Sequence, residues 1–197
     1  MLKLLLGFEK PKSGSIFFDG QSLEELSPSS VRSQMGVVLQ NGKLMTGDIF
    51  SNIAGQTILS EEDAWEAAEK AGIAEDIEKM PMGMQTIITE GGGNLSGGQR
   101  QRLLIARAIA AKPAILIFDE ATSALDNRAQ AIVVKSLEKL QVTRITIAHR
   151  LSTVKNADRI LVLDDGEIKE SGNFKELMEK NGFFAKLAKR QIVQQKF

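Results

Sequence analysis

Hydrophobic positions along the 197-residue chain follow two different patterns. Short, nearly unbroken apolar runs, such as the ILIF of residues 115–118, are typical of strands that are buried on both faces. Longer segments between them repeat apolar residues every three or four positions, which favours helices with one buried face. Helices that alternate with buried strands predict an α/β fold with a parallel sheet.

The positions of these segments predict a core with an inserted helical lobe. Strands are expected at residues 15–20, 35–39, 114–120, 143–149 and 159–172, the last containing an Asp-Gly turn. Helices are expected at residues 1–7, 97–111, 126–140, 149–158 and 173–191, with a series of amphipathic helices at 48–83. We therefore divide residues 1–197 into a core with a small antiparallel β region (1–44), a helical subdomain (45–105), and a second core segment with the C-terminal helices (106–197).

Composition and charge narrow the class of protein. With 43% hydrophobic and 25% charged residues, the chain has the composition of a globular protein. Its formal net charge of +0 argues against a dedicated nucleic-acid binder, so no nucleic-acid partner is expected. The absence of cysteine excludes disulfides and cysteine-ligated metals. No apolar run reaches the roughly 18 residues of a membrane-spanning helix.

The stretch LSGGQRQR, residues 95–102, carries the first candidate chemistry. Its turn consists of Ser96, Gly97, Gly98 and Gln99. Glycines at the start of a helix let backbone amides approach an anion closely, so the turn predicts a phosphate site. A nucleotide also needs a main phosphate cradle of the form G-x-x-x-x-G-K-[ST], and the sequence contains none.

Five further residues carry weaker signals, each with an ordinary structural alternative. Asp119 and Glu120 end a buried strand, where paired carboxylates can hold Mg²⁺ and activate water, or simply form a solvated turn. The one histidine, His149, and Gln40 also follow strands, and each could be no more than a structural hydrogen-bonding residue. Asp126 could be the N-cap of the helix that follows it.

Taken together and in this order, Gln40, LSGGQ, ILIFDE, SALD and His149 resemble the ATP-binding cassette of ABC transporters. The resemblance spans the whole chain, and LSGGQRQR followed by a strand ending in Asp-Glu is a highly specific combination. It implies a P-loop NTPase fold of ABC type with ATP and Mg²⁺ as cofactors. It also implies that the intact parent hydrolyses ATP to drive transport across a membrane.

The resemblance further implies a role for each candidate residue. Gln40 and Asp119 would serve Mg²⁺, and Gln40 would also sense the attacking water. Glu120 would be the general base, and His149 would contact the γ-phosphate. The remaining groups are the signature (Ser96, Gly97, Gly98 and Gln99), the D-loop (Ser123, Ala124, Leu125 and Asp126) and the coupling loop of exporters (Thr89, Glu90 and Gly91).

Two partners are implied by the same resemblance. In such cassettes the signature of one copy closes over the nucleotide of another, so a second, head-to-tail cassette is expected. A transmembrane domain is the other partner, which places the cassette at the cytoplasmic face of the membrane. The stretch MGVVLQNGKLMTGDIFSNI and the coupling loop look more like exporters, among them peptide exporters, than importers.

The chain departs from the family pattern at its N-terminal end. Family cassettes have an adenine-stacking aromatic residue and several strands before the phosphate loop, whereas this sequence has neither that loop nor any tyrosine. The opening MLKLLLGFEKPKSG resembles the segment that follows the loop. We therefore expect an N-terminally truncated sheet, and a chain that alone binds ATP weakly and hydrolyses almost none.

Two other functions fit the same motifs. One is a soluble ABC-type ATPase of translation or DNA repair. At 1.5 Å per residue, the roughly 54 residues between Gln40 and Leu95 are too few for the long coiled coil of many such proteins. The other is a non-catalytic cassette that donates only its signature motif to a partner.

Overall fold

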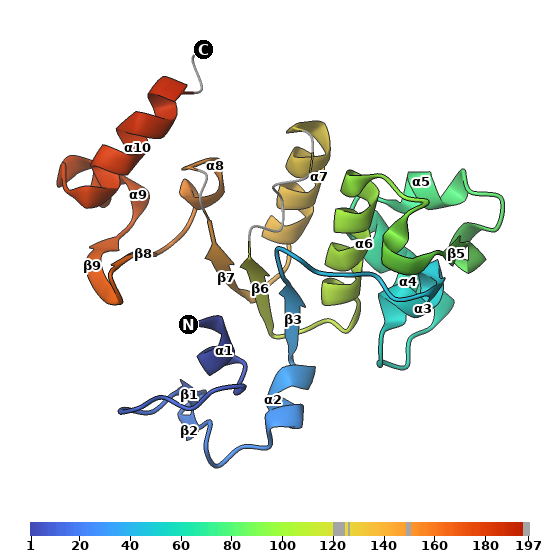
Figure 1. Ribbon diagram of the computed structural model, residues 1–197, viewed down its shortest axis with the longest axis horizontal. Helices are drawn as coiled ribbons and strands as arrows, with labels where there is room; N and C mark the ends of the chain where they lie inside the picture. Colours follow the sequence, from blue (N-terminus) through green and yellow to red (C-terminus); the bar gives the residue numbers. More distant parts are fainter. Residues whose placement is uncertain (120–124, 126, 149–150, 195–197) are drawn as a thin grey trace. The chain divides into compact units, whose positions relative to one another are not determined.

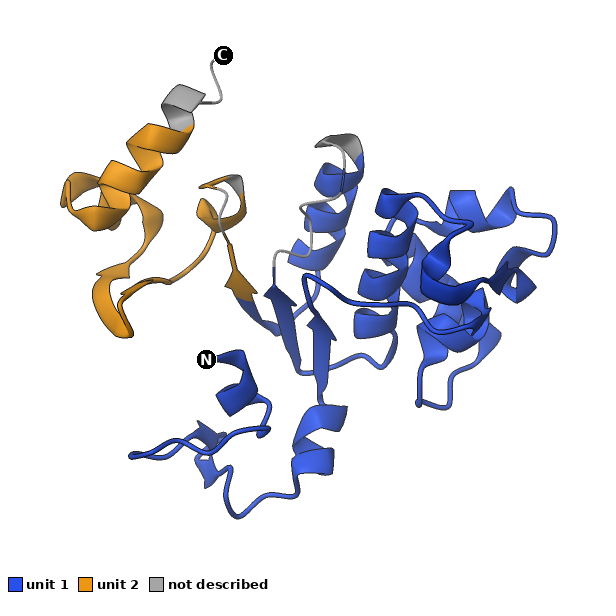
Figure 2. Cartoon of the chain, viewed as in Figure 1, with its two compact units in different colours: residues 1–145 blue, residues 146–197 orange. Residues whose placement is uncertain are grey.

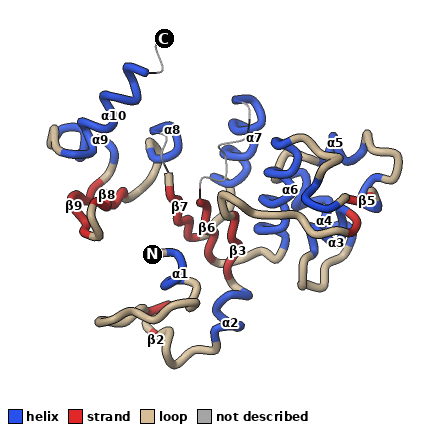
Figure 3. The backbone as a smooth tube through the Cα atoms, viewed as in Figure 1, coloured by secondary structure: helices blue, strands red, loops and turns tan. Residues whose placement is uncertain are grey.

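The structure, a computed structural model, describes residues 1–119, 125, 127–148 and 151–194. It contains two compact units, Met1–Ile145 and Thr146–Phe197 (Figure 2). Strands and helices alternate along much of the chain, as the apolar pattern predicts (Figure 3). In the described part of the chain, no helix is both long and apolar enough to cross a bilayer.

The main sheet has three strands in the order β3 (Met35–Val38), β6 (Ile115–Asp119) and β7 (Thr143–Ile147). β3 and β6 are parallel, with Met35 beside Ile115 and Val38 beside Phe118. Leu116 and Ile117 point to opposite faces of β6, and both are fully buried. The strand is therefore covered on both faces, as its apolar run predicts. Helix α7 (Asn127–Glu138) lies between β6 and β7 in the chain (Figure 1).

Helix α6 (Gly97–Ala110) lies close against β3 at Gly36. A Cβ atom added at Gly36 would overlap the carbonyl oxygen of Ala108 and lie 2.6 Å from Leu116 Cδ2. The helix and strand backbones therefore approach so closely that only glycine fits between them. This contact determines where α6 packs on the sheet.

A lobe of short helices follows β3 in the chain, and α6 packs against its helices α3 and α4. The lobe consists of α3 (Ile49–Ala54), α4 (Glu61–Lys70), α5 (Ala74–Glu78) and the short 3₁₀ helices η1 (Gly83–Gln85) and η2 (Glu90–Gly92). The antiparallel strands β4 (Gly47–Asp48) and β5 (Ile87–Ile88) join its two ends. Sequence pattern does not predict this pair, because two residues are too few to show an alternation.

The N-terminal part of the first unit contains a small antiparallel β region. It consists of α1 (Leu2–Leu5), the antiparallel pair β1 (Phe17–Phe18) and β2 (Gln21–Ser22), and α2 (Pro28–Ser33). Asp19 and Gly20 connect the two strands with φ angles of 49° and 79°. Two positive φ angles are what a two-residue hairpin turn requires, which explains the Asp-Gly sequence.

The described residues of the second unit form a hairpin and three helices. Its elements are α8 (Leu151–Val154), β8 (Ile160–Asp164), β9 (Glu167–Gly172), α9 (Phe174–Glu179) and α10 (Phe183–Gln194). The carboxylate of Glu170, in β9, accepts from the amides of Phe183 and Phe184 at 2.8 and 2.9 Å. Strand β9 thus supplies the N-terminal cap of α10.

Candidate functional site

Helix α6 begins at the predicted phosphate-binding turn. Ser96 Oγ accepts from the Gln99 amide at 3.2 Å, and Gln99 Oε1 accepts from the Ser96 amide at 3.0 Å. Among the described residues, no hydrogen bond uses the amides of Gly97 and Gly98. Ser96 and Gly97 are also exposed. The helix therefore presents two open backbone donors at the positive end of its dipole.

Nothing in the packing of this unit requires a glycine at position 97. A Cβ atom there would have Arg100 Nη2, at 3.8 Å, as its nearest contact, which is an ordinary van der Waals distance. Glycine is a poor helix former, so its presence in the first turn of α6 weakens the helix. Because glycine has no Cβ atom, a ligand can approach the backbone amides at this exposed helix N-terminus closely.

A carboxylate of the helical lobe holds this turn. Asp76, in α5, accepts from Gln99 Nε2 with one oxygen and from Arg102 Nη2 with the other, both at 2.8 Å. The side chain of Arg102 is only 13% exposed, and that of Asp76 is 34% exposed. Sequence reasoning missed Asp76, because it lies 23 residues before Gln99 and no local pattern marks it.

The loop that precedes the turn is closed by its own hydrogen bonds. Arg100 Nη1 donates to the carbonyl oxygens of Gly92, at 3.3 Å, and Leu95, at 3.1 Å. Asn94 Oδ1 accepts from the Thr89 amide at 3.3 Å. The predicted coupling residues Thr89, Glu90 and Gly91 are all exposed. They are therefore accessible to a partner, and their coupling role stays a prediction.

Gln40 and Asp119 leave the sheet at the same edge. Val38 lies beside Phe118 in the parallel pair, so Asp119 ends β6 where Gln40 follows β3 by two residues. Asp119 is half-buried, whereas Gln40 is exposed. A carboxylate and an amide oxygen are ligands that suit Mg²⁺. The two residues therefore suit Mg²⁺ in chemistry, and their role as its ligands stays a prediction.

An open groove of about 420 Å³ separates residues 40–43 from the first turns of α6. Gln40 lines one side of it, and Gly97, Arg100 and Gln101 line the other. Gln101 is 8% exposed, and its Nε2 has no hydrogen-bond partner in the part of the chain that the structure describes. The fold thus brings the predicted Gln40 and Gly97 to one groove.

A buried network fixes the segment between Gln40 and α3. Arg107, in the last turn of α6, donates to the carbonyl oxygen and to Oδ1 of Asn52, both at 2.6 Å, and to the carbonyl oxygen of Lys43 at 3.2 Å. Asn52, 1% exposed, in turn accepts from the Met45 amide at 2.8 Å and donates to its carbonyl oxygen at 2.9 Å. Burial lowers the pKa of Arg107. Neither residue was predicted, because their partners are distant in sequence.

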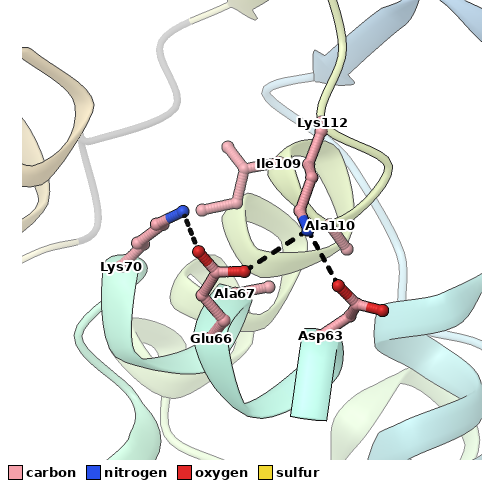
Figure 4. A pocket seen from close by; sticks show the side chains of 7 residues that line it. All are labelled: Asp63, Glu66, Ala67, Lys70, Ile109, Ala110 and Lys112. Carbon is pink, nitrogen blue, oxygen red and sulfur yellow. Dashed lines mark hydrogen bonds and ion pairs between the residues drawn. The ribbon is translucent and has the colours of Figure 1, made fainter. Parts of the chain in front are cut away.

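A separate cluster of charges lies at the C-terminal end of α6 (Figure 4). Lys112 Nζ lies 2.9 Å from Asp63 Oδ1 and 3.6 Å from Glu66 Oε2, and Lys70 pairs with Glu66 at 2.7 Å. Hydrogen bonds from Lys112 and from the hydroxyl and amide of Ser60 together lower the pKa of Asp63 from 3.8 to about 2. The cavity among these side chains is about 10 Å³, no larger than a water requires. The cluster therefore joins α4 to α6 and is not a substrate site.

Five predicted site residues lie outside the described residues: Glu120, Ser123, Ala124, Asp126 and His149. Their proposed roles as base, D-loop and γ-phosphate contact stay predictions. Leu125, the remaining D-loop residue, is described and is buried at 6% exposure.

Comparison with known proteins identifies the family. The sequence profile of the family described as "ABC transporter" matches residues 1–123 of this chain. The chain belongs to the ABC transporter family. The resemblance drawn from the signature and from the strand ending in Asp-Glu is therefore confirmed, and so is the predicted ABC-type fold.

Relatives of this ABC transporter chain include several bacterial proteins. The "Uncharacterized ABC transporter ATP-binding protein YwjA" of Bacillus subtilis is 44% identical over 98% of this chain. The "Alpha-hemolysin translocation ATP-binding protein HlyB" of Escherichia coli O157:H7 is 48% identical over 91% of it. The "ATP-dependent lipid A-core flippase" of Haemophilus influenzae is 45% identical over 96% of it. The chain spans only 34%, 26% and 33% of these three proteins, respectively.

A solved structure is similar to nearly the whole ABC transporter chain. The structure titled "Structure of a bacterial Atm1-family ABC exporter with ATP bound" superimposes with a TM-score of 0.93 at 39% identity. The match covers 96% of this chain and 34% of the exporter chain. At this identity the similarity extends beyond the fold to the family, in agreement with the sequence relatives.

Proposed function

We propose that this chain is the ATP-binding part of an ABC exporter, in which ATP binding and hydrolysis drive transport. The observation that carries the proposal is the exposed start of α6, where the amides of Gly97 and Gly98 have no partner among the described residues. The relatives support it, since those described are named as ATP-binding or ATP-dependent proteins and two of those names specify translocation or a flippase.

The signature would bind the γ-phosphate of a nucleotide held by a second cassette. Ser96 Oγ accepts from the Gln99 amide, so its hydroxyl proton remains available as a donor. Together with the two glycine amides, it offers three donors to one anion. The nucleotide that meets these donors would be held by the partner, as a head-to-tail pair of cassettes provides.

The sheet edge would hold the metal and the attacking water. Asp119 and Gln40 fit Mg²⁺ in chemistry, and bound Mg²⁺ would neutralise developing charge on the phosphate oxygens. Glu120 would accept the proton of the attacking water as general base, and His149 would contact the γ-phosphate. Leu125 would belong to the D-loop with Ser123, Ala124 and Asp126.

The transporter would contain a transmembrane domain, with this cassette at the cytoplasmic face of the membrane. The exposed coupling residues Thr89, Glu90 and Gly91 would contact that domain, because their loop is held rigid by Asn94 and Arg100 while their side chains stay accessible. Peptides are the expected class of cargo.

The deciding experiment places Gly97→Asp in the full-length transporter that contains this chain. The added carboxylate would face the γ-phosphate, so we expect ATP turnover to fall about 100-fold or more. ADP lacks that phosphate, so its affinity should stay within about twofold, a difference of less than 0.5 kcal/mol.

A mixed dimer tests whether the signature acts on the nucleotide of the partner. In it, one subunit carries Gly97→Asp and the other lacks only the phosphate-loop lysine. One composite site per dimer would then be intact, and turnover should partly return. Loss of ADP binding in Gly97→Asp, or turnover equal to that of the wild type, would contradict the proposal.

A further inference from the structure

A chain of hydrogen bonds connects α5 to the first residue of the signature. Arg102 Nη2 donates to Asp76 Oδ2, and Gln99 Nε2 donates to Asp76 Oδ1, both at 2.8 Å. Gln99 Oε1 then accepts from the Ser96 amide at 3.0 Å. Both polar atoms of the Gln99 side chain are therefore engaged within the chain, on one side by the lobe and on the other by the helix cap.

This arrangement gives Gln99 a different task from that of its neighbours. Ser96 is exposed, and Gly97 and Gly98 offer open amides, whereas the Gln99 side chain is held inward by Asp76. Because its Nε2 is bound to Asp76 and its Oε1 to the Ser96 amide, the Gln99 side chain restrains the backbone from Ser96 to Gln99. The orientation of the Ser96 amide therefore depends on Gln99, and the orientation of Gln99 depends on Asp76.

We propose that Asp76 is the positioning residue of the signature: through Gln99 it aims Ser96 and the two glycine amides at the γ-phosphate held by the partner cassette. This inference rests on the function proposed above. Asp76 itself would not contact the nucleotide. It would act by keeping the donors where the phosphate arrives, so that none has to be reoriented during the reaction.

The chemistry of the site explains why a carboxylate is needed. Arg102 is only 13% exposed, and a guanidinium that is mostly removed from water requires an anionic partner. Asparagine at position 76 would keep an oxygen for Gln99 Nε2 but would lose the charge that faces Arg102. Alanine would remove both interactions. Alanine at position 76 should therefore reduce ATP turnover more than asparagine does.

The experiment measures ATP turnover and ADP affinity in the full-length transporter that contains this chain. For Asp76→Ala we expect kcat to fall about 10-fold, since misplaced catalytic donors are costly, while the Kd of ADP stays unchanged. The kcat of Asp76→Asn should fall less than that of Asp76→Ala. The matched control is Glu75→Gln on the same helix, because Glu75 is 90% exposed and pairs only loosely with Lys79 at 3.9 Å; its kcat should equal that of the wild type.

A double-mutant cycle separates positioning from general destabilisation. If Asp76 acts through Gln99, then Asp76→Ala combined with Gln99→Ala should lose no more turnover than the more damaging single variant. If the two losses multiply, Asp76 does not act through Gln99 and the inference is overturned. A fall in ADP affinity in Asp76→Asn would also overturn it, because the damage would then reach beyond the signature.

The outcome distinguishes this inference from the proposed function. If Gly97→Asp abolishes turnover while Asp76→Ala and Asp76→Asn turn over ATP like the wild type, the inference is wrong and the function stands. If Gly97→Asp has no effect, the function is wrong, and the inference falls with it. Should Asp76→Ala reduce the amount of folded transporter, turnover per folded molecule of the isosteric Asp76→Asn decides the question.

Discussion

Two glycines beside helix α6 have opposite surroundings. At Gly36 a Cβ atom would overlap the carbonyl oxygen of Ala108, so the packing of the unit demands glycine. At Gly97 the nearest contact of a Cβ atom would be 3.8 Å away, so packing does not demand it. The glycine at position 36 is explained by packing, whereas Gly97 has neither a crowded Cβ position nor a positive φ angle, so its explanation lies outside the chain. The phosphate contact proposed above would supply that explanation at Gly97.

The largest effect on stability is expected for Gly36→Ala. The new methyl group must push α6 away from β3, so the free energy of unfolding should fall by about 3 kcal/mol. Urea unfolding of the chain can be followed by the fluorescence of Trp65, the one tryptophan in a chain without tyrosine, which packs against the core. A loss under about 0.5 kcal/mol would mean that the close contact at Gly36 is wrong.

A smaller loss of stability is expected for Asn52→Ala, in the network that joins the last turn of α6 to residues 43–45. The substitution leaves Arg107 Nη2 and the Met45 amide without the Asn52 Oδ1 acceptor, and unsatisfied buried groups should cost about 2 kcal/mol. Hydrogen exchange of the Met45 amide should accelerate beyond the change in global stability. Exchange that follows global stability alone would show that the network does not hold this segment.

Gly97→Ala should change stability by only about 0.5 kcal/mol, and in the stabilising direction, because alanine is the better helix former. The same variant in the full-length transporter should turn over ATP more slowly than the wild type. If Gly97→Ala raises stability but lowers turnover, the glycine at position 97 is needed for activity and not for packing, unlike Gly36. If Gly36→Ala and Gly97→Ala destabilise the chain equally, the packing difference between the two glycines is wrong.

The smallest effect is expected at the other end of α6, where Lys112 pairs with Asp63. The folded pKa of Asp63 is lowered from 3.8 to about 2, so the stabilisation is present above pH 3.8 and is lost as the pH falls through about 2. The wild type and Lys112→Ala should therefore differ slightly in stability at pH 5 and converge at the acid end. If the difference in stability between the wild type and Lys112→Ala grows as the pH falls, the ion pair between Lys112 and Asp63 is not its cause.

Much of the fold could be predicted from local patterns. The apolar run that becomes β6 marks a strand buried on both faces, and the Asp-Gly pairs at residues 19–20 and 165–166 mark hairpin turns with positive φ angles. The signature turn was also predictable, because its capping pair, Ser96 and Gln99, lies within one helical turn. Each of these features depends on residues that are close in sequence.

The sequence by itself determined the family and the elements, because both are encoded in short stretches such as LSGGQRQR and ILIFDE. Only the tertiary structure decided which residues support the signature. Asp76 reaches Gln99 across 23 residues, and Arg107 reaches Asn52 across 55. Hydrogen bonds over such separations depend on how α5, α3 and α6 pack, and no periodicity in the sequence records them. The same packing decided why Gly36 and Gly97, identical in the sequence, serve different purposes.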